Sequence, residues 1–520
     1  MDDKIPKILI ALAITLFSCA NLYSQIRISG SLSGTLEDTT YIVEDSVYII
    51  EGRTLEIEAG ATLLFDDGVK FIISGRLIAN GTELDSILFI LNDGAEAWGG
   101  LDFWIHASQF SSMEYCRVSG SNSSGIQCLS YGCPFPLSNC VISGNSSPYD
   151  GSGIRWNFYF PRTIDNCTIS NNEGIGIYTD GQLTLDSCTI NNNTERGIVS
   201  ISSMEINNCI ISDNSEGGVY AEGDLSVQNT VIARNSTDGA GGGIYSPFQG
   251  ELIELYRCVI AQNNSEYWGG GISCQSKSAS IRNCTIVNNS TEGNGGGIFA
   301  DLYNLEIVNT CIAFNTGLGG IFNSYSTETE IHHSSFFENE IADIVVDIPE
   351  LFGVINRVNS NQDSCDQYYN IFALPQLTSS ENLDYSLLSS SPLIDAGDPD
   401  FPWDPDGTIA DIGAIYYSQY EYLIERRIQP LPSEFEIISI YPNPFNSTAS
   451  IVINLATPER VTISLYNILG RKICVLADRN FSEGSNVLSF QADGLSSGSY
   501  IVKATTATNS SDYKKINLLR

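Results

Sequence analysis

Short stretches in which apolar and polar residues alternate dominate this chain, and one such stretch recurs. Residues 139–145 read Asn-Cys-Val-Ile-Ser-Gly-Asn, and related copies follow at steps of 21 to 28 residues. The copies begin at Asn166, Ser187, Asn208, Asn229, Arg257, Asn283, Asn309 and His333. This step length, with apolar residues at every second position and no 3.6-residue period, is typical of the turns of a parallel β-helix.

The alternation within each copy predicts which side chains are buried. Cys140 and Ile142 lie two residues apart, so both face the core. The same position holds Cys116, Cys140, Cys167, Cys188, Cys209, Cys258 and Cys284, with Thr230 and Thr310 in two other turns. Cβ atoms stacked about 4.8 Å apart are too distant for disulfides, which prefer about 3.8 Å. We therefore expect a column of small buried core residues rather than disulfides or metal ligands.

An Asn falls five residues after the Cys position, where each turn bends. These residues are Asn145, Asn172, Asn193, Asn214, Asn235, Asn263, Asn289, Asn315 and Asn339. Stacked turns would let each side chain hydrogen-bond to the next, and Asn tolerates left-handed backbone angles. We expect a structural ladder.

A second short strand follows a Gly-Ile corner in each turn, as at Gly176-Ile177 and Gly218-Val219. The glycines are expected to supply unusual backbone angles. The residue after the corner points outward, and an acidic residue often follows two positions later. The candidate ligand-binding residues are Tyr178, Asp180, Tyr220, Glu222, Tyr245, Phe299 and Asp301. Aromatic faces beside carboxylates suit a sugar-binding groove, although the same aromatics also suit strands or packing beneath loops.

The N-terminal residues 1–24 are expected to be a signal peptide. Lys4 and Lys7 precede an apolar run over residues 8–17 that is too short to span a bilayer, and cleavage is expected before Gln25. Lipoprotein processing at Cys19 is the alternative. No other segment is apolar and long enough to cross a membrane, so the mature chain should lack a transmembrane segment.

The net charge of −36 bears on possible partners. It argues against nucleic acid and anionic membranes, both of which require clustered Lys and Arg. An anionic polysaccharide would bind this surface poorly unless a cation such as calcium bridged the two.

Residues 25–102 lack the Asn motif but alternate in the same way. These residues resemble the opening turns of bacterial right-handed β-helix surface proteins in the segments Tyr41–Val43, Gly52–Gly60, Gly75–Ala79 and Trp98–Leu101. The chain is therefore expected to be all-β, with a right-handed parallel β-helix over residues 25–350 and a closing segment and linker over 351–432. About thirteen turns would give a rod of roughly 60 Å.

The closing segment holds Asp404, Asp406 and Asp411, whose oxygens are candidate calcium ligands. A turn with Asp caps is the alternative, because the spacing departs from that of an EF-hand. In an earlier turn, Cys128 and Cys133 lie in an insertion and are candidates for a disulfide in an oxidising compartment.

Residues 433–520 are expected to form a small Ig-like β-sandwich of six alternating strands. They resemble the C-terminal sorting domain of the type IX secretion system, with the basic end Lys514-Lys515 to Arg520 and the motif Leu465–Gly470. The sorting motif itself comprises Tyr441, Pro442, Asn443, Pro444, Phe445 and Asn446. The resemblance implies recognition by the type IX secretion machinery and export to the cell surface or medium, with the cargo released or tethered.

Two functional hypotheses remain, and fold does not decide between them. One is a non-catalytic, adhesin-like protein that binds extracellular polysaccharide or cell-surface glycans. The other is a polysaccharide lyase or hydrolase of the pectate-lyase-like fold. An enzyme would need an acid–base pair or a basic residue with calcium, and the available Arg155, Arg196, Arg234 and Arg282 are isolated. The three histidines, His106, His332 and His333, are expected at the surface or an edge. We favour the non-catalytic hypothesis.

Overall fold

The computed structural model describes most of the chain as two compact units, residues 1–419 and 420–520. The described residues are 26–128, 136–148, 151–157, 161–247, 250, 252–325, 328–378, 383–419, 435–441, 443, 445, 448–455, 458–467, 471–481, 484–492, 495–507 and 511–518. The predicted signal peptide lies outside them. They form no helix long and apolar enough to cross a membrane.

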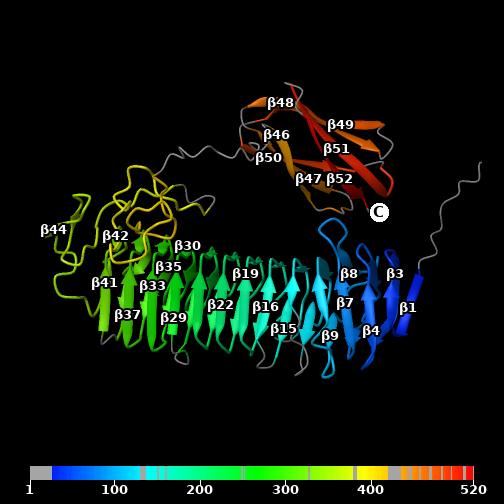
Figure 1. Ribbon diagram of the computed structural model, residues 1–520, viewed down its shortest axis with the longest axis horizontal. Helices are drawn as coiled ribbons and strands as arrows, with labels where there is room; N and C mark the ends of the chain where they lie inside the picture. The colour runs from blue at the N-terminus through cyan, green and yellow to red at the C-terminus, as the bar shows by residue number, and fades with distance from the viewer. Residues whose placement is uncertain are drawn as a thin grey trace, which may run out of the picture. The chain divides into compact units, whose positions relative to one another are not determined.

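The first unit is a parallel β-solenoid in which each turn contributes one strand to each of three ladders (Figure 1). The first ladder contains part of β3 (Thr40–Ile49), followed by β5 (Thr62–Phe65), β8 (Ile87–Leu91), β11 (Cys116–Ser119), β14 (Val141–Ser143), β17 (Thr168–Ser170), β20 (Thr189–Asn191), β23 (Ile210–Ser212), β26 (Val231–Ala233), β30 (Val259–Ala261), β34 (Thr285–Val287), β38 (Cys311–Ala313) and β42 (Ser335–Phe337). The second ladder contains β6 (Phe71–Ile73), β9 (Leu101–Phe103), β12 (Ile126–Cys128), β15 (Ile154–Trp156), β18 (Ile177–Thr179), β21 (Ile198–Ser200), β24 (Val219–Ala221), β28 (Ile244–Ser246), β32 (Ile272–Cys274), β36 (Ile298–Ala300), β40 (Ile321–Asn323) and β43 (Ile344–Val345). Two longer strands, β1 (Ile26–Ser31) and β3 (Thr40–Ile49), run through both ladders.

The third ladder is a separate 13-stranded sheet. It contains β2 (Gly34–Leu36), β4 (Thr54–Ile57), β7 (Arg76–Asn80), β10 (Ser112–Glu114), β13 (Leu137–Ser138), β16 (Arg162–Asp165), β19 (Leu183–Asp186), β22 (Met204–Asn207), β25 (Leu225–Gln228), β29 (Leu252–Tyr256), β33 (Ser278–Arg282), β37 (Asn304–Val308) and β41 (Glu328–His332). Late turns add a short sheet of β27 (Ser236–Thr237), β31 (Asn264–Ser265), β35 (Ser290–Asn294) and β39 (Thr316–Leu318).

The Cys column faces the core, as expected, and also takes part in hydrogen bonding. Cys188 donates its backbone N–H to Cys209 Sγ at 3.4 Å, and Cys209 donates its own to Thr230 Oγ1 at 3.2 Å. Each side chain also donates to a carbonyl two residues back, as Cys209 does to Asn207 O at 3.1 Å. Thr replaces Cys because its hydroxyl can both accept and donate in the same way.

The Asn ladder is also confirmed. Each Asn donates Nδ2–H to the Oδ1 of the next Asn at 2.9–3.1 Å from Asn145 to Asn339. The left-handed backbone angle falls on the residue before the ladder Asn, for example Asn192 before Asn193 (φ 54°) and Arg234 before Asn235 (φ 56°). The left-handed backbone angle expected at the ladder Asn therefore lies one residue before it.

The glycine directly before the Ile or Val at each corner is required for a different reason from the one expected. Gly197 and Gly218 do not have positive φ angles. A Cβ atom on Gly197 would instead lie 2.8 Å from Asn214 Nδ2 and 2.8 Å from Gly218 O. These glycines are required because the Asn ladder and the neighbouring backbone leave no room for a side chain.

The closing segment folds back onto the outer face of the first ladder in the late turns. Its buried Ile371, Leu393 and Ile412 pack against Val287 and Ala313. Backbone bonds run from Ile371 N–H to Ser334 O at 2.8 Å and from Gly413 N–H to Asn309 O at 2.8 Å. A small hairpin, β44 (Arg357–Val358) and β45 (Ser364–Cys365), lies within this segment.

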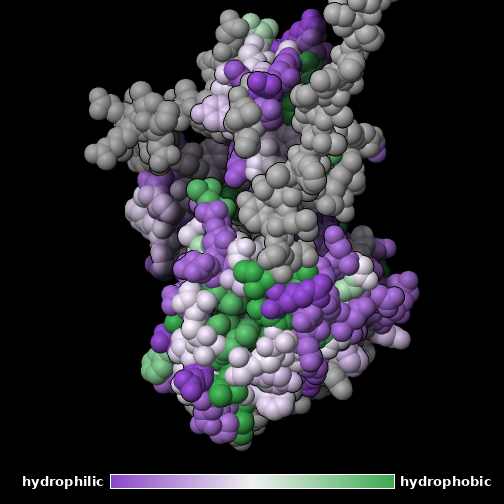
Figure 2. Space-filling model, turned by 90° about the vertical axis from the view of Figure 1, so that its right-hand side faces the viewer, coloured by the Kyte–Doolittle hydropathy of each residue, from purple (hydrophilic) through white to green (hydrophobic). Residues whose placement is uncertain are grey.

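The other end of the solenoid begins with an edge strand. Among the described residues β1 pairs with β3 alone, and Ile26 is exposed while Ile28 and Leu32 are partly buried against the core. Figure 2 looks onto this end and shows apolar surface gathered there. Within residues 26–419 as described, the first turn packs against a neighbouring turn on one side only, so its apolar residues Ile26 and Ile28 are less covered than those of later turns.

The second unit consists of two antiparallel sheets, β46-β47-β50 and β49-β48-β51-β52. Its strands are β46 (Phe435–Tyr441), β47 (Thr448–Leu455), β48 (Glu459–Asn467), β49 (Lys472–Phe481), β50 (Gly484–Gln491), β51 (Gly498–Thr506) and β52 (Ser511–Leu518). Ile451 and Ile453 of one sheet and Val461, Ile463 and Val502 of the other share one core. The unit is a small β-sandwich, with β46 in addition to the six strands expected.

Candidate glycan-binding face

The outward residues of the second ladder form one column in strict register. Paired positions run Arg155, Tyr178, Val199, Tyr220, Tyr245, Ser273, Phe299, Phe322 and Val345. The column is the one that the Gly-Ile corners predicted, because strand side chains alternate between the two faces of a sheet. Asp180, Glu222 and Asp301 follow the strands and are half-buried. We call this column, with the residues that contact it, the aromatic face.

The middle of the aromatic face is a connected cluster around Tyr220 and Tyr245. Their rings pack edge to face with centroids 5.6 Å apart, and the Arg196 guanidinium lies 5.3 and 5.8 Å from the two centroids. The Tyr220 hydroxyl donates to Glu222 Oε1 at 2.8 Å. Burial and this carboxylate raise the pKa of Tyr220 to about 12, while burial lowers the pKa of Arg196. The two tyrosines are therefore held in place by their neighbours and are only half-exposed.

A second aromatic cluster lies further along the rod. Trp268 stacks on Phe299 with centroids 5.3 Å apart, and Phe299 stacks on Phe322 at 5.8 Å. Phe299 is only 5% exposed, whereas Trp268 is 40% exposed. Phe299 thus supports an indole ring that presents its other surface to solvent. Trp268 precedes the glycines of the corner and lies outside the strands, so strand alternation did not identify it.

Two exposed tyrosines lie in the same turns, where the chain passes from the second ladder to the third. Tyr303 and Tyr325 are 56% and 58% exposed, and their rings pack edge to face with centroids 6.2 Å apart. Tyr303 follows Asp301 by two residues, and Asp301 follows Phe299 by two. Strand alternation did not identify either tyrosine. Their recurrence after the Gly-Ile strands of two consecutive turns is the sequence signal that points to them.

The aspartates predicted to bind calcium accept hydrogen bonds from other groups of the protein. Asp404 accepts from Arg257 Nη2 at 3.1 Å and from the Asp411 N–H at 2.8 Å. Asp411 accepts from the Asp395 N–H at 2.7 Å, and Asp406 accepts from Thr408 Oγ1 at 2.8 Å. Such bonds are those of a turn capped by aspartates, and calcium binding here stays a prediction.

The isolated arginines have structural partners. Arg234 donates to both carboxylate oxygens of Asp213 at 2.8 and 2.7 Å, and Arg282 donates to both oxygens of Glu306 at 2.8 and 2.7 Å. Arg155 is half-buried in the column. Over the described part of the chain, His332, His333 and Asp398 are the one group of three His, Cys, Asp or Glu whose ligand atoms all lie within 4.8 Å of one another.

The described residues of the sorting motif lie against the last strand of the second unit. Phe445 is buried and donates its N–H to Asn517 O at 2.9 Å. Asn443 accepts from the Asn517 N–H at 2.7 Å and donates to Lys515 O at 3.3 Å. Tyr441 ends β46, while Pro442, Pro444 and Asn446 lie outside the described residues. Cys133 also lies outside them, so its pairing with the buried Cys128 stays a prediction.

Comparison with solved structures finds distant similarity only. The chain is 12% identical to pectate lyase Pel9A with a TM-score of 0.37, over 71% of this chain and 88% of that one. It is 11% identical to the enzymatically active domain of tailspike protein 2 from bacteriophage CBA120, with a TM-score of 0.22, over 92% and 72%. Scores this low carry no argument about activity. No curated protein matches the chain.

Comparison with protein families agrees with both units. Residues 99–236 match the family described as right handed beta helix region. Residues 439–518 match the secretion system C-terminal sorting domain, which implies export to the cell surface or the extracellular space. The chain is a right-handed parallel β-helix protein that carries a secretion system C-terminal sorting domain.

Proposed function

We propose that this protein is exported by the type IX route and binds neutral glycans without catalysis through the late turns of its aromatic face. The observation that carries the proposal is the set of exposed rings there. Trp268 offers an indole surface braced from beneath by Phe299, and Tyr303 and Tyr325 offer two more rings. Flat aromatic surfaces pack against the apolar faces of sugar rings, and nearby carboxylates accept their hydroxyl hydrogens.

The charge of the chain supports a neutral ligand. With a net charge of −36, the surface repels uronate or sulfate polymers unless a cation intervenes. Asp301 lies between Phe299 and Tyr303 in the sequence and is half-buried. Its partly exposed carboxylate can accept hydrogen bonds from sugar hydroxyl groups and would repel an anionic ligand.

A glycan array probed with the full mature chain tests the proposal, followed by affinity measurements on any glycan that binds. Trp268→Ala and Tyr303→Ala should each weaken binding by about fivefold or more, because losing one stacked ring costs about 1 kcal/mol. Trp104→Ala is the matched control, because Trp104 is similarly exposed at 49% but lies in an early turn. Equal binding by Trp268→Ala and Trp104→Ala would remove Trp268 from the site.

The non-catalytic part of the proposal needs its own measurement. The wild-type chain should release no reducing ends and no unsaturated uronates from neutral or acidic polysaccharides, with or without calcium. Turnover of any of them would establish the lyase or hydrolase hypothesis in place of this one.

A further inference from the structure

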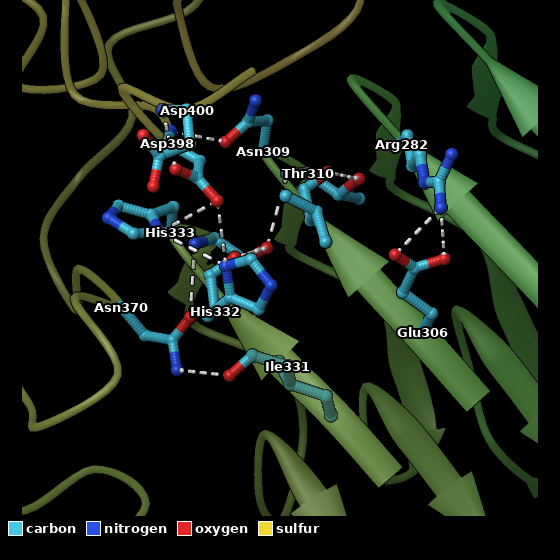
Figure 3. A network of polar contacts seen from close by, with 12 residues as sticks. Arg282, Glu306, Asn309, Thr310, Ile331, His332, His333, Asn370, Asp398 and Asp400 are labelled. Carbon is cyan, nitrogen blue, oxygen red and sulfur yellow. Dashed lines mark hydrogen bonds and ion pairs between the residues drawn. The ribbon is translucent and has the colours of Figure 1, made fainter. Parts of the chain in front are cut away.

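Two histidines and an aspartate meet where the last turns of the solenoid contact the closing segment. His332 ends β41. His333 directly precedes the Cys position of its turn and has a left-handed backbone angle (φ 46°), as Asn309 has one turn earlier (φ 51°). Asp398 comes from the closing segment, 65 residues beyond His333. Figure 3 shows the two imidazoles and the Asp398 carboxylate facing one another.

The three ligand atoms have the separation of a metal site. His332 Nδ1 lies 3.0 Å from His333 Nδ1, and Asp398 Oδ2 lies 3.5 Å and 3.9 Å from these two atoms. A triangle with these sides has a circumscribed radius of about 2.0 Å, which matches zinc–nitrogen and zinc–oxygen bond lengths of about 2.0 to 2.2 Å. We propose that His332, His333 and Asp398 bind one divalent transition-metal ion of the zinc type.

The kind of ion follows from the donor atoms. Two imidazole nitrogens and one carboxylate oxygen suit zinc and its first-row neighbours, whereas calcium and magnesium prefer oxygen ligands alone. The side chains of His332, His333 and Asp398 are 29%, 15% and 16% exposed. An ion can therefore reach the site from solvent, and water can fill its remaining positions.

The surroundings hold each ligand in place. Asp398 Oδ1 accepts from the Asp400 N–H at 2.9 Å and the Asp398 N–H donates to Asn309 Oδ1 at 2.7 Å, which directs Oδ2 toward the histidines. The His333 ring stacks on Tyr369 with centroids 4.9 Å apart and an interplanar angle of 4°. The backbone N–H of His333 donates to Tyr368 O at 3.0 Å. Ligands fixed by such contacts lose little freedom on binding a metal.

An ion at this position would join two parts of the chain. His332 and His333 belong to the solenoid, and Asp398 belongs to the segment that covers the outer face of the first ladder. Because the bound ion would favour the docked closing segment over an undocked one, metal binding should stabilise the first unit. This role is independent of the proposed glycan binding and does not require catalysis.

The test uses the untagged mature chain after chelator treatment, titrated with ZnCl₂ by calorimetry in excess calcium to occupy surface carboxylates. One equivalent should bind and raise the thermal midpoint. His332→Gln and Asp398→Asn should each weaken zinc binding by about tenfold or more and abolish the thermal shift. His106→Gln is the matched control, since it removes the third histidine of the chain, which is exposed near Glu51.

A second measurement uses the wild-type chain alone and so does not depend on a variant that folds. Zinc should protect His332 and His333, but not His106, from carbethoxylation detected by peptide mass spectrometry. Absence of a one-equivalent binding event in the wild type would overturn the proposal. So would equal protection of all three histidines, or undiminished binding by both His332→Gln and Asp398→Asn.

Discussion

The Asn ladder makes a quantitative prediction about stability at Asn214, in the middle of the rod. Asn214 Oδ1 accepts from Asn193 N–H at 3.1 Å and from Asn193 Nδ2 at 2.9 Å. Asn214 Nδ2 donates to Ile190 O at 3.2 Å and to Asn235 Oδ1 at 2.9 Å. The side chain is 1% exposed, so water cannot replace these bonds.

Asn214→Ala should lower the free energy of unfolding by about 4 kcal/mol, since four hydrogen bonds are lost at about 1 kcal/mol each. The groups that bond to the Asn214 side chain are not equally affected by its removal. Asn193 Nδ2 keeps its bond to Ile169 O, and Asn235 Oδ1 keeps its bond from Asn214 N–H, whereas the Asn193 N–H loses the acceptor that Asn214 supplied. That buried backbone donor should therefore make the largest single contribution to the loss.

Two further variants separate hydrogen bonding from packing. Asn214→Asp keeps the size of the side chain but sets an oxygen against Ile190 O and Asn235 Oδ1, so it should be at least as destabilising as Asn214→Ala. Asn207→Ala changes an outward residue of the same turn and should alter stability by no more than about 0.5 kcal/mol.

Urea unfolding followed by tryptophan fluorescence measures these differences in the full chain. All five tryptophans, Trp98, Trp104, Trp156, Trp268 and Trp403, lie in the first unit, so the signal reports on the solenoid and closing segment alone. If Asn214→Ala and Asn207→Ala unfold at the same urea concentration with equal slopes, the ladder does not stabilise the rod and the reasoning fails.

Two other predictions concern the core and the closing segment. Cys209→Thr should retain wild-type stability within about 1 kcal/mol, because the Thr hydroxyl can still accept from the Cys188 N–H. Cys209→Val should lose about 1–2 kcal/mol more, because the Cys188 N–H then has no acceptor there. Equal urea midpoints for Cys209→Thr and Cys209→Val would contradict this. Burial raises the pKa of Asp411 to about 7 in the folded protein, while in the unfolded chain it is about 4. Asp411 therefore contributes stability that is fully present below pH about 4, and this contribution should be lost as the pH rises toward about 7. Asp411→Asn should flatten this part of the profile of urea midpoint against pH, and an unchanged slope would exclude Asp411 as its source.

The repeat made much of this fold predictable. Cys209 and Ile211 recur in register two residues apart, so alternation predicts that both are buried. Asn214 lies at the bend, and its burial goes with its hydrogen bonds to Asn193 and Asn235 in the ladder. The left-handed position before each ladder Asn was not predicted because its residue type varies between turns, for example Asn192 in one turn and Phe314 in another. Stacking of the turns imposes that conformation, so no residue type marks it. The third ladder was not predicted because no single residue type marks it in every turn: its inward position holds Ile206, Val227 and Leu255 in successive turns.

The candidate sites were less predictable, because their side chains lie outside the register. The column with Tyr220 and Tyr245 followed from alternation, but Trp268 precedes its strand and stacks on Phe299 of the next turn, a contact that alternation does not predict. His332 and Asp398 lie 66 residues apart in the sequence. A periodic pattern predicts which turns are neighbours, and it contains no information about where a non-repeating closing segment docks.

The spacing of the repeats explains how Trp268 comes to be exposed in the late turns. The steps from Ser187 to Asn229 are 21 residues each, while those from Asn229 to Asn309 are 28, 26 and 26. In the short turns six residues separate the first-ladder strand β20 from β21, and in the long turns ten separate β30 from β32. The added residues form the short sheet of β27, β31, β35 and β39. Trp268 lies at the end of such an insertion and can therefore reach across to Phe299, so shortening this loop to the 21-residue pattern should remove the exposed indole while leaving the Asn ladder intact.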